Sequence, residues 1–401
     1  MNRHTWRLPD GIDEVLPPDA WALEQLRRRV LDLFVAWGYQ YVEPPLVEFL
    51  DSLLVGSGND LELQTFRMVD QRSGRMLGIR ADMTSQAARI DAASLRGDGT
   101  RRLCYAGTVV HANPTGVLES RVPLLAGAEL FGANDAEADA EVVALMVDAL
   151  HCAGIDEPVI ELGHVGIFRS LAAAGDFDRA REQALFLALQ RKAKPDLEEL
   201  LAGSVPGSVS RSVAAAILAL PDLLGDVGVL DRARKAFAGL PDGVHEALNE
   251  LQVLAHAVAQ RCEQVKLRFD LCELTGYGYH TGAVFAAYSE NFGRAVARGG
   301  RYDGVGVSFG RARPATGFDV DLKRLPRASG ANAGTAVWAP GLRWVPAERR
   351  DALWCAVRDL RAAGERVIGA LNESEAPTDD CDREFVWQKN AWRVQTLKRR
   401  R

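Results

Sequence analysis

The sequence predicts an α+β fold: a body of strands and helices, a helical insertion and a short C-terminal α/β segment. Three observations indicate this class. Alternating apolar and polar residues, the pattern of strands with one buried face, recur along much of the chain. Residues 169 to 261 are instead rich in alanine and leucine and show no strand pattern. A linker composition at residues 326 to 336 then separates off the C-terminal segment.

Length and composition indicate a soluble protein of two or three domains. The chain has 401 residues, of which 47% are hydrophobic and 25% charged. No apolar run approaches the ~20 residues that a membrane span needs. Residues 1 to 10 lack the apolar core of a signal peptide. We therefore expect a cytoplasmic protein without contact to a membrane.

The net charge and the cysteine spacing argue against a nucleic-acid surface, a zinc site and a disulfide framework. The net charge of −6 argues against a broad nucleic-acid surface, and the basic residues 398 to 401 are read as a solvated tail. The six cysteines are scattered without a C-x-x-C pair, which indicates buried free thiols rather than a zinc site or a disulfide framework. We expect neither a bound metal nor a cofactor.

The N-terminal third predicts a helix followed by irregular strands. Apolar residues spaced by three and four between residues 21 and 37 define one helix face, with Asp19 as its cap and Gly38 at its end. Pro44 and Pro45 forbid a central strand in the next segment, which suits a sheet edge or a subunit contact. Residues 64 to 80 predict a hairpin whose inward residues include Met68.

For several polar residues in the next segments, the sequence allows either a role in ligand binding or a purely structural role. In "RADMTSQAAR", Asp82 and Thr84 either cap a helix or hold a ligand's ammonium group. Strands at residues 103 to 111 and 123 to 131 are joined by a long polar loop. Glu129 lies in the second strand among apolar residues, so it needs either a ligand amine or an arginine as its partner.

The segment "VKLRFDLCELTGYGYHTGAVF", residues 265 to 285, is the most distinctive of the chain. It begins as a half-buried strand, passes through a glycine-rich turn and enters a second apolar strand. The turn carries Tyr277, Tyr279 and His280, whose polar groups suit a small polar ligand, although an ordinary glycine hairpin explains the pattern too. Residues 137 to 150 predict a helix and residues 159 to 168 a strand before the helical insertion.

The last part of the chain contributes two notable arginines and a short tail. Arg301 and Arg324 either grip an anion or pair with Asp303 and Asp321, and Arg324 is expected on a helix that begins near Gly317. The tail predicts one helix, a strand at residues 367 to 371 and a hairpin around residues 388 to 390. It is thin for an independent domain, so we expect it to dock on the body.

Six ordered segments together resemble the histidyl-tRNA synthetase family. They are "GYQYVEPPLVEF", "RADMT", the block from "CYAGTVVHANP" to "GAELFG", "GYGYHTGAVF", "GGRYDG" and "GFDVDLKRL", and they follow the order of the three class II motifs and two histidine-specific motifs. The resemblance implies a class II synthetase-like core, an antiparallel sheet flanked by helices, at residues 1 to 168 and 262 to 326. A helical insertion at residues 169 to 261 interrupts the core, and a short C-terminal domain spans residues 337 to 401.

The resemblance also implies a histidine pocket. Asp82 and Thr84 match the block that holds the ligand's amino group, Glu129 matches the "ExFG" carboxylate, and Tyr279 and His280 match the paired tyrosines of the histidine-specific loop. Two carboxylates facing an ammonium and an imidazole make chemical sense for histidine.

Departures from the family pattern argue against synthetase chemistry and imply no catalytic residues. His111 stands where the family has an arginine on the ATP α-phosphate, Asn113 where it has a glutamate, and Thr275 where a second arginine promotes adenylate formation. Loss of one such group typically costs ~100-fold or more in rate. Leu125 replaces a glutamine that contacts the ligand, whereas Arg324 matches the retained motif 3 arginine.

These departures and the short, acidic C-terminal part resemble the ATP phosphoribosyltransferase regulatory subunits. That resemblance implies a non-catalytic protein of histidine biosynthesis and its feedback regulation, with histidine as a possible effector. It also implies a homodimer through the motif 1 region, a larger hetero-oligomer with the short-form catalytic subunit, and no tRNA. A divergent adenylate-forming enzyme and a plain histidine- or RNA-binding scaffold are the alternatives.

Overall fold

The computed structural model describes residues 7–55, 59–95, 97–113, 116, 119–202, 211–263, 265–290, 292–325 and 335–397. The chain forms two compact units, one of Met1–Glu14 with Leu26–Pro326 and one of Val15–Gln25 with Arg327–Arg401. Most of the predicted linker and the basic tail lie outside the described residues.

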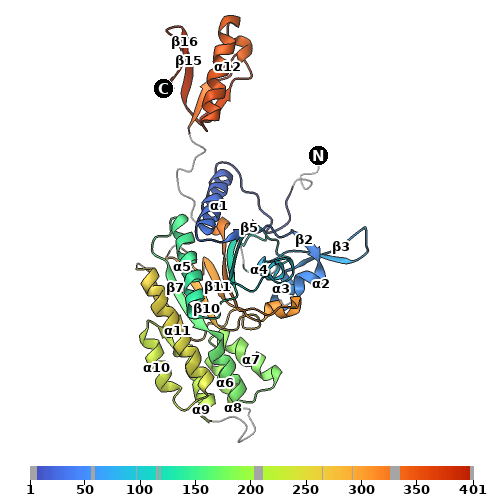
Figure 1. Ribbon diagram of the computed structural model, residues 1–401, viewed down its shortest axis with the longest axis vertical. Coiled ribbons are helices and arrows are strands. Elements are labelled where there is room, and N and C mark those ends of the chain that lie inside the picture. The colour runs from blue at the N-terminus through green and yellow to red at the C-terminus, as the bar shows by residue number, and fades with distance from the viewer. Residues whose placement is uncertain are drawn as a thin grey trace. The chain divides into compact units, whose positions relative to one another are not determined.

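The larger unit is organised around a nine-stranded sheet (Figure 1). Its order is β1 (Gln40–Tyr41), β5 (Arg101–Thr108), β6 (Leu124–Phe131), β12 (Ala315–Asp321), β11 (Ala297–Arg301), β10 (Ala283–Tyr288), β7 (Val159–His164), β9 (Lys266–Asp270) and β8 (Leu224–Gly225). Only the β1–β5 and β7–β9 pairs are parallel. The mainly antiparallel sheet confirms the predicted fold class.

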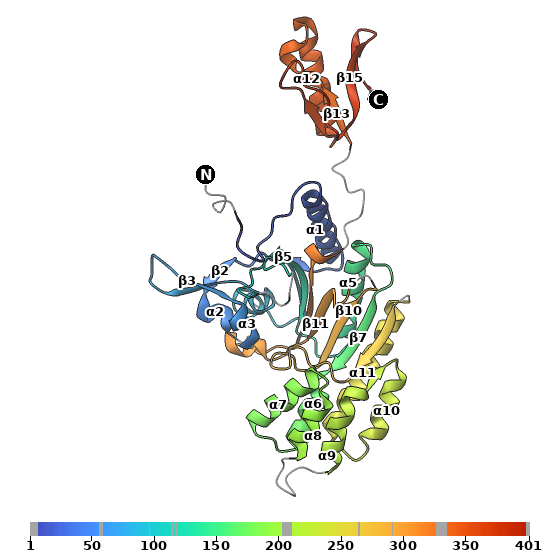
Figure 2. The same ribbon diagram turned by 180° about the vertical axis from the view of Figure 1, so that it is seen from behind.

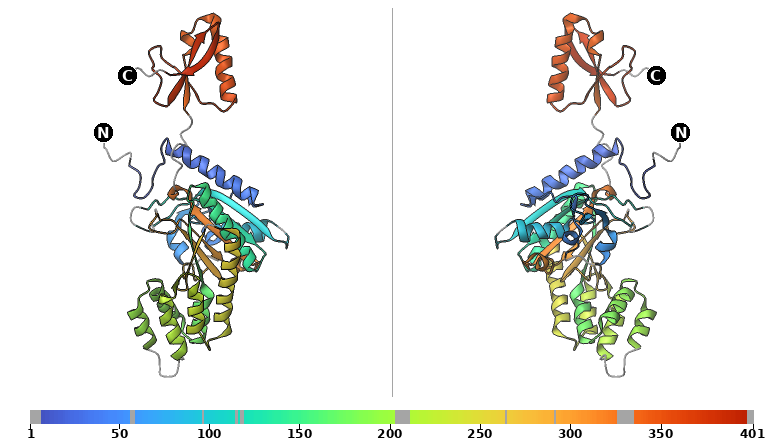
Figure 3. Two further views of the ribbon diagram at one scale, coloured as in Figure 1. Left: turned by 90° about the vertical axis from the view of Figure 1, so that its left-hand side faces the viewer. Right: turned by 90° about the vertical axis from the view of Figure 1, so that its right-hand side faces the viewer.

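Helices flank this sheet and gather at one end of the unit (Figures 1 and 2). They are α1 (Asp19–Ala36), α2 (Leu50–Leu54), α3 (Asn59–Gln64), α4 (Thr84–Arg89), α5 (Ala136–Cys152), α6 (Val165–Ala174), α7 (Arg179–Gln190), α8 (Lys194–Ala202), α9 (Arg211–Ala219), α10 (Gly228–Ala236) and α11 (Asp242–Arg261). Figure 3 shows α6 to α11 clustered together in a side view. No described helix is long and apolar enough to cross a membrane.

Three local predictions from the sequence are wrong. The strand expected over residues 159 to 168 ends at His164, because the His164 Nδ1 accepts the Gly166 N–H and begins α6. The two strands around the glycine-rich turn are not a hairpin, since β7 lies between β9 and β10. The helical insertion also contains the short strand β8, which pairs with β9.

A second, three-stranded sheet carries the predicted hairpin. It consists of β2 (Val47–Phe49), β4 (Met76–Ile79) and β3 (Phe66–Val69), all antiparallel. Met68 was expected to point inward but is 40% exposed. The hairpin thus leaves apolar surface uncovered.

The C-terminal part has a core of its own, although the sequence suggested that it is thin for an independent domain. Its sheet has the order β14 (Val367–Gly369), β13 (Ala336–Ala339), β15 (Cys381–Gln388) and β16 (Ala391–Thr396). Helix α12 (Ala347–Ala362) supplies Leu353 and Val357, which pack with Val337 and Phe385.

The cysteines are free thiols in the structure. Cys104, Cys272 and Cys381 are buried, as expected for structural thiols, whereas Cys355 is exposed.

Candidate functional site

The centre of the large sheet presents a polar face built around glycines. Glu129 on β6 lies opposite Gly317 on β12, and Gly317 lies opposite Gly300 on β11. Paired residues of antiparallel strands place their side chains on one face. A β-carbon at Gly317 would overlap the Glu129 carboxylate, and one at Gly300 would lie 2.8 Å from the His280 ring. The glycines therefore make room for these two side chains.

Glu129 is the deepest charged residue of this face, with 1% of its surface exposed. The hydroxyls of Tyr105, at 2.8 Å, and of Tyr302 donate to its carboxylate. Burial, reinforced by the charge of Asp82, raises the pKa of Glu129 to about 8 although the tyrosine hydrogen bonds oppose this. Its partners are thus two hydroxyls that the sequence did not suggest, rather than an arginine.

Asp82 and Thr84 lie beside Glu129 at the start of α4. The Asp82 Oδ1 accepts the backbone N–H groups of Met83 at 2.6 Å and Thr84 at 3.2 Å, which is the geometry of a helix-starting turn. The Thr84 hydroxyl lies 3.2 Å from the Tyr105 hydroxyl. Burial raises the pKa of Asp82 despite these hydrogen bonds. Asp82 therefore supports the turn just before α4, whose N-cap is Met83 without a side-chain cap, and it also faces the polar site.

Asp319 is a third carboxylate, which the sequence analysis missed. It lies on β12 opposite Gly127, on the same face as Glu129. Burial and the neighbouring Asp82 raise the pKa of Asp319 to about 7, while Arg298 acts in the opposite direction. Its signal was an acidic residue in an apolar strand, as for Glu129. We call Asp82, Glu129 and Asp319 the carboxylate cluster.

Tyr279 and His280 differ in whether their polar groups are already bonded within the protein. The Tyr279 ring stacks on Tyr302 at 5.1 Å, and its buried hydroxyl has no hydrogen-bond partner among the described residues. The His280 Nδ1 lies 3.3 Å from the Arg301 carbonyl oxygen, and burial lowers the pKa of His280 to about 4. His280 is therefore a neutral framework residue, whereas the Tyr279 hydroxyl is available to a ligand.

At three of the positions that depart from the synthetase pattern, His111, Asn113 and Leu125, the side chain provides no cation for a phosphate. Thr275, the fourth, accepts a hydrogen bond from Arg298 at 3.1 Å. The His111 Nε2 lies 3.1 Å from the Ala81 carbonyl oxygen, and burial lowers the pKa of His111, so the ring is neutral. Asn113 donates to the Leu63 carbonyl oxygen at 2.9 Å. Leu125 is buried in an apolar cluster that includes Tyr105 and Met83.

The two arginines noted in the sequence are both occupied. Arg301 points to the opposite face of the sheet, where it binds both oxygens of Asp139 at 2.9 and 3.1 Å and contacts Asp303 at 3.3 Å. Arg324 contacts Glu119 at 3.3 Å. Arg324 lies in the three-residue turn Leu322–Arg324 after β12, so the helix expected from Gly317 is wrong. Of the two alternatives that the sequence left open for Arg301, the structure shows the ion pair with Asp303.

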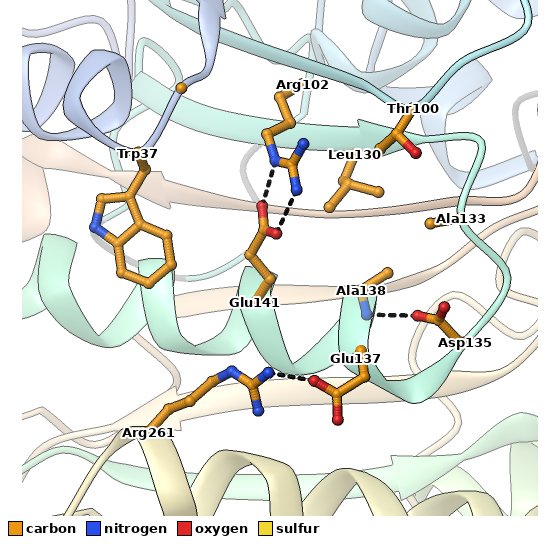
Figure 4. A pocket seen from close by; sticks show the side chains of 11 residues that line it. Trp37, Thr100, Arg102, Leu130, Ala133, Asp135, Glu137, Ala138, Glu141 and Arg261 are labelled. Atoms are coloured by element: carbon orange, nitrogen blue, oxygen red, sulfur yellow. Dashed lines mark hydrogen bonds and ion pairs between the residues drawn. The ribbon is translucent and has the colours of Figure 1, made fainter.

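A separate cavity of about 530 Å³ lies on that opposite face (Figure 4). Arg102 binds both oxygens of Glu141 at 2.6 Å, and Arg261 binds Glu137. The sequence analysis did not identify this cavity. Its lining also includes Trp37, Gly38, Thr100, Leu130, Ala133, Asp135 and Ala138.

Comparison with known families divides the chain at the same place as the fold. The histidyl-tRNA synthetase family model matches residues 11–325. The model described as "ATP phosphoribosyltransferase subunit HisZ C-terminal domain" matches residues 335–395.

Curated relatives match over nearly the whole length. The ATP phosphoribosyltransferase regulatory subunit of Teredinibacter turnerae is 47% identical, and that of Chromohalobacter salexigens 50% identical, each with 98% of both chains covered. The chain belongs to the ATP phosphoribosyltransferase regulatory subunit family. The resemblance stated from the sequence, and the regulatory role it implied, are thereby confirmed.

Solved structures support the same fold for a member of this family. A Bacillus halodurans structure titled as an ATP phosphoribosyltransferase regulatory subunit/histidyl-tRNA synthetase aligns with a TM-score of 0.81 and 28% identity, covering 94% of this chain and 96% of that one. A Nostoc histidyl-tRNA synthetase aligns with a TM-score of 0.73 at 16% identity, covering 95% and 91%. The latter shows the fold alone.

Proposed function

We propose that this chain is a cytoplasmic, non-catalytic regulatory subunit that has lost synthetase activity and activates the short-form catalytic subunit of ATP phosphoribosyltransferase. The observation that carries the proposal is the carboxylate cluster. Three acids that would suit the ammonium group of an amino acid lie together, while the residues at the arginine positions of the synthetases are His111 and Thr275.

Electrostatics argues against ATP at this site. A nucleotide triphosphate is a polyanion, and its activation adds negative charge that must be neutralised by fixed cations. In their ionised forms, Asp82 and Asp319 would instead repel it, because like charges in a poorly solvated site interact strongly. Neutral His111 does not replace a guanidinium.

The same cluster suits histidine as an effector. A ligand ammonium would find Asp82 and Thr84, and an imidazole would find Glu129 and the Tyr279 hydroxyl. Opposite charges and charge-assisted hydrogen bonds favour such a ligand in a buried site. Feedback inhibition would follow if bound histidine stabilises a less active state of the complex.

We also propose a homodimer through the motif 1 region, residues 21 to 49, within the larger hetero-oligomer. Exposed apolar side chains in this region include Val35, Tyr41, Leu46 and Val47. A twofold interface would cover this surface, as apolar patches on soluble proteins usually require.

Activity assays of the purified full-length chain test the proposal. We expect no histidine-dependent exchange of pyrophosphate into ATP and no tRNA charging, but activation of the short catalytic subunit on mixing. Robust adenylate formation would favour the alternative of a divergent synthetase-like enzyme. Failure to bind or activate the catalytic subunit would count against the regulatory role.

A further inference from the structure

We infer that Arg298 binds the carboxylate of an α-amino acid held at the carboxylate cluster. This inference rests on the proposed binding of histidine and deepens it, because it assigns the cation that a zwitterionic ligand needs. Neither the sequence motifs nor the site residues carried over from the synthetases include Arg298.

The position of Arg298 places it at the edge of the cluster. It lies on β11 directly opposite Asp319 on β12, so the two side chains share the face that carries Glu129. Arg298 Nη1 donates to the Thr275 hydroxyl at 3.1 Å. A guanidinium from β11 therefore reaches the residue that stands in place of a synthetase arginine.

Arg298 is also free to bind a ligand. Its side chain is exposed, and it forms no ion pair with the acidic residues that the structure describes. The guanidinium can rotate about its long stem and offer two parallel N–H groups to a carboxylate.

The other arginines near the site bind other groups of the protein. Arg169 donates to the carbonyl oxygens of Tyr277 and His280 at 3.1 and 2.9 Å. Arg324 contacts Glu119, and Arg301 contacts Asp139 on the opposite face. Arg80, two residues before Asp82, donates to the carbonyl oxygens of Thr108 and Pro44 at 2.9 and 2.6 Å. Among these neighbours, Arg298 is left as the partner for a ligand carboxylate.

The spacing fits an α-amino acid. The ammonium and carboxylate of such a ligand are attached to one carbon atom, so their protein partners must lie close together. Residues paired across antiparallel strands have β-carbons ~5 Å apart. Asp319 and Arg298 can therefore contact the two groups at once, with Asp82 as a second partner of the ammonium.

Calorimetric titration of the full-length chain with L-histidine and L-histidinol tests this assignment, because histidinol has an alcohol in place of the carboxylate. We expect Arg298→Ala to weaken L-histidine roughly 10- to 100-fold, as for loss of a charge-assisted hydrogen bond. The same substitution should change L-histidinol affinity by about twofold or less.

Arg268→Ala is the matched control, since Arg268 is an exposed arginine on β9 of the same sheet. It should leave both affinities unchanged. Equal weakening of both ligands by Arg298→Ala, or no weakening of either, would overturn the assignment while leaving histidine binding itself intact. Absence of binding to the wild-type chain would instead overturn the proposed histidine site and, with it, this inference.

Discussion

The acidic residues on the two faces of strands β5 and β6 have different partners. On one face, Asp82, Glu129 and Asp319 gather with hydroxyl groups. On the other, Glu141 and Glu137 line a cavity, and each is bound by an arginine. Glu129 and Leu130 are consecutive, yet one faces the cluster and the other lines the cavity.

This difference separates stability from binding. A carboxylate matched by an arginine is already neutralised, so it anchors helices to the sheet and has little left for a ligand. A carboxylate surrounded by hydroxyls and other acids is unfavourable when ionised, and a ligand cation would relieve that repulsion. The comparison predicts that mutations on the two faces affect different measurements.

The largest effect should come from Arg301→Ala on the arginine-paired face. The change leaves Asp139 buried without its cation, and breaking a buried pair costs ~3–5 kcal/mol of unfolding free energy. Urea denaturation measures it. Arg324→Ala is the control. The Arg324 side chain is 38% exposed, so its ion pair with Glu119 should contribute below ~1 kcal/mol to the unfolding free energy. Similar losses in both variants would contradict the distinction.

The next effect should appear in the pH dependence of Glu129→Gln. The folded-state pKa of Glu129 is about 8 and its ordinary value is 4.5, so the folded wild type binds more protons than the unfolded chain between these pH values. Stability from this group is complete below pH 4.5 and is lost as the pH rises through about 8, by up to ~1.4 kcal/mol per pH unit.

The Glu129→Gln variant should therefore lose less stability than the wild type as the pH rises from 6 to 9. Urea denaturation at several pH values measures the slope. Asp319→Asn serves as a companion variant with a change of the same sign, since burial raises its pKa to about 7. Parallel curves for wild type and Glu129→Gln would show that Glu129 is ionised without penalty.

A smaller effect is expected for Arg102→Ala at the cavity. The Arg102–Glu141 pair is partly exposed, and Glu141 keeps the hydrogen bond from the Tyr39 hydroxyl at 3.1 Å. We expect a loss of ~1 kcal/mol in unfolding free energy and unchanged affinity for L-histidine. A large fall in L-histidine affinity would mean that the two faces are coupled rather than independent.

The sequence was sufficient for features that depend on local pattern. The N-terminal helix and most strand positions follow from periodicity, and the fold class follows from the family resemblance. The resemblance also proposed Asp82, Thr84, Glu129 and Tyr279, which the structure brings to one side of the sheet. Tyr279 lies near these acids. Its burial and the charges of Glu129 and Asp82 raise the pKa of its hydroxyl.

Long-range pairing accounts for what the sequence did not reveal. Tyr302 donates to Glu129 across 173 residues, and Asp139 pairs with Arg301 across 162. The insertion of β7 between β9 and β10 is equally non-local. The direction of Arg301 depends on strand register, because a shift of one residue reverses the face of a side chain.

The central claim is that the carboxylate cluster binds an amino acid but no nucleotide. Calorimetric titration of the full-length chain with L-histidine, followed by ATP, tests it directly, with Glu129→Ala titrated in parallel. We predict saturable binding of L-histidine that weakens at least ~10-fold in Glu129→Ala, and no heat from ATP in either protein. Tight ATP binding to the histidine-loaded wild type, or L-histidine binding that is indifferent to Glu129→Ala, would contradict the account.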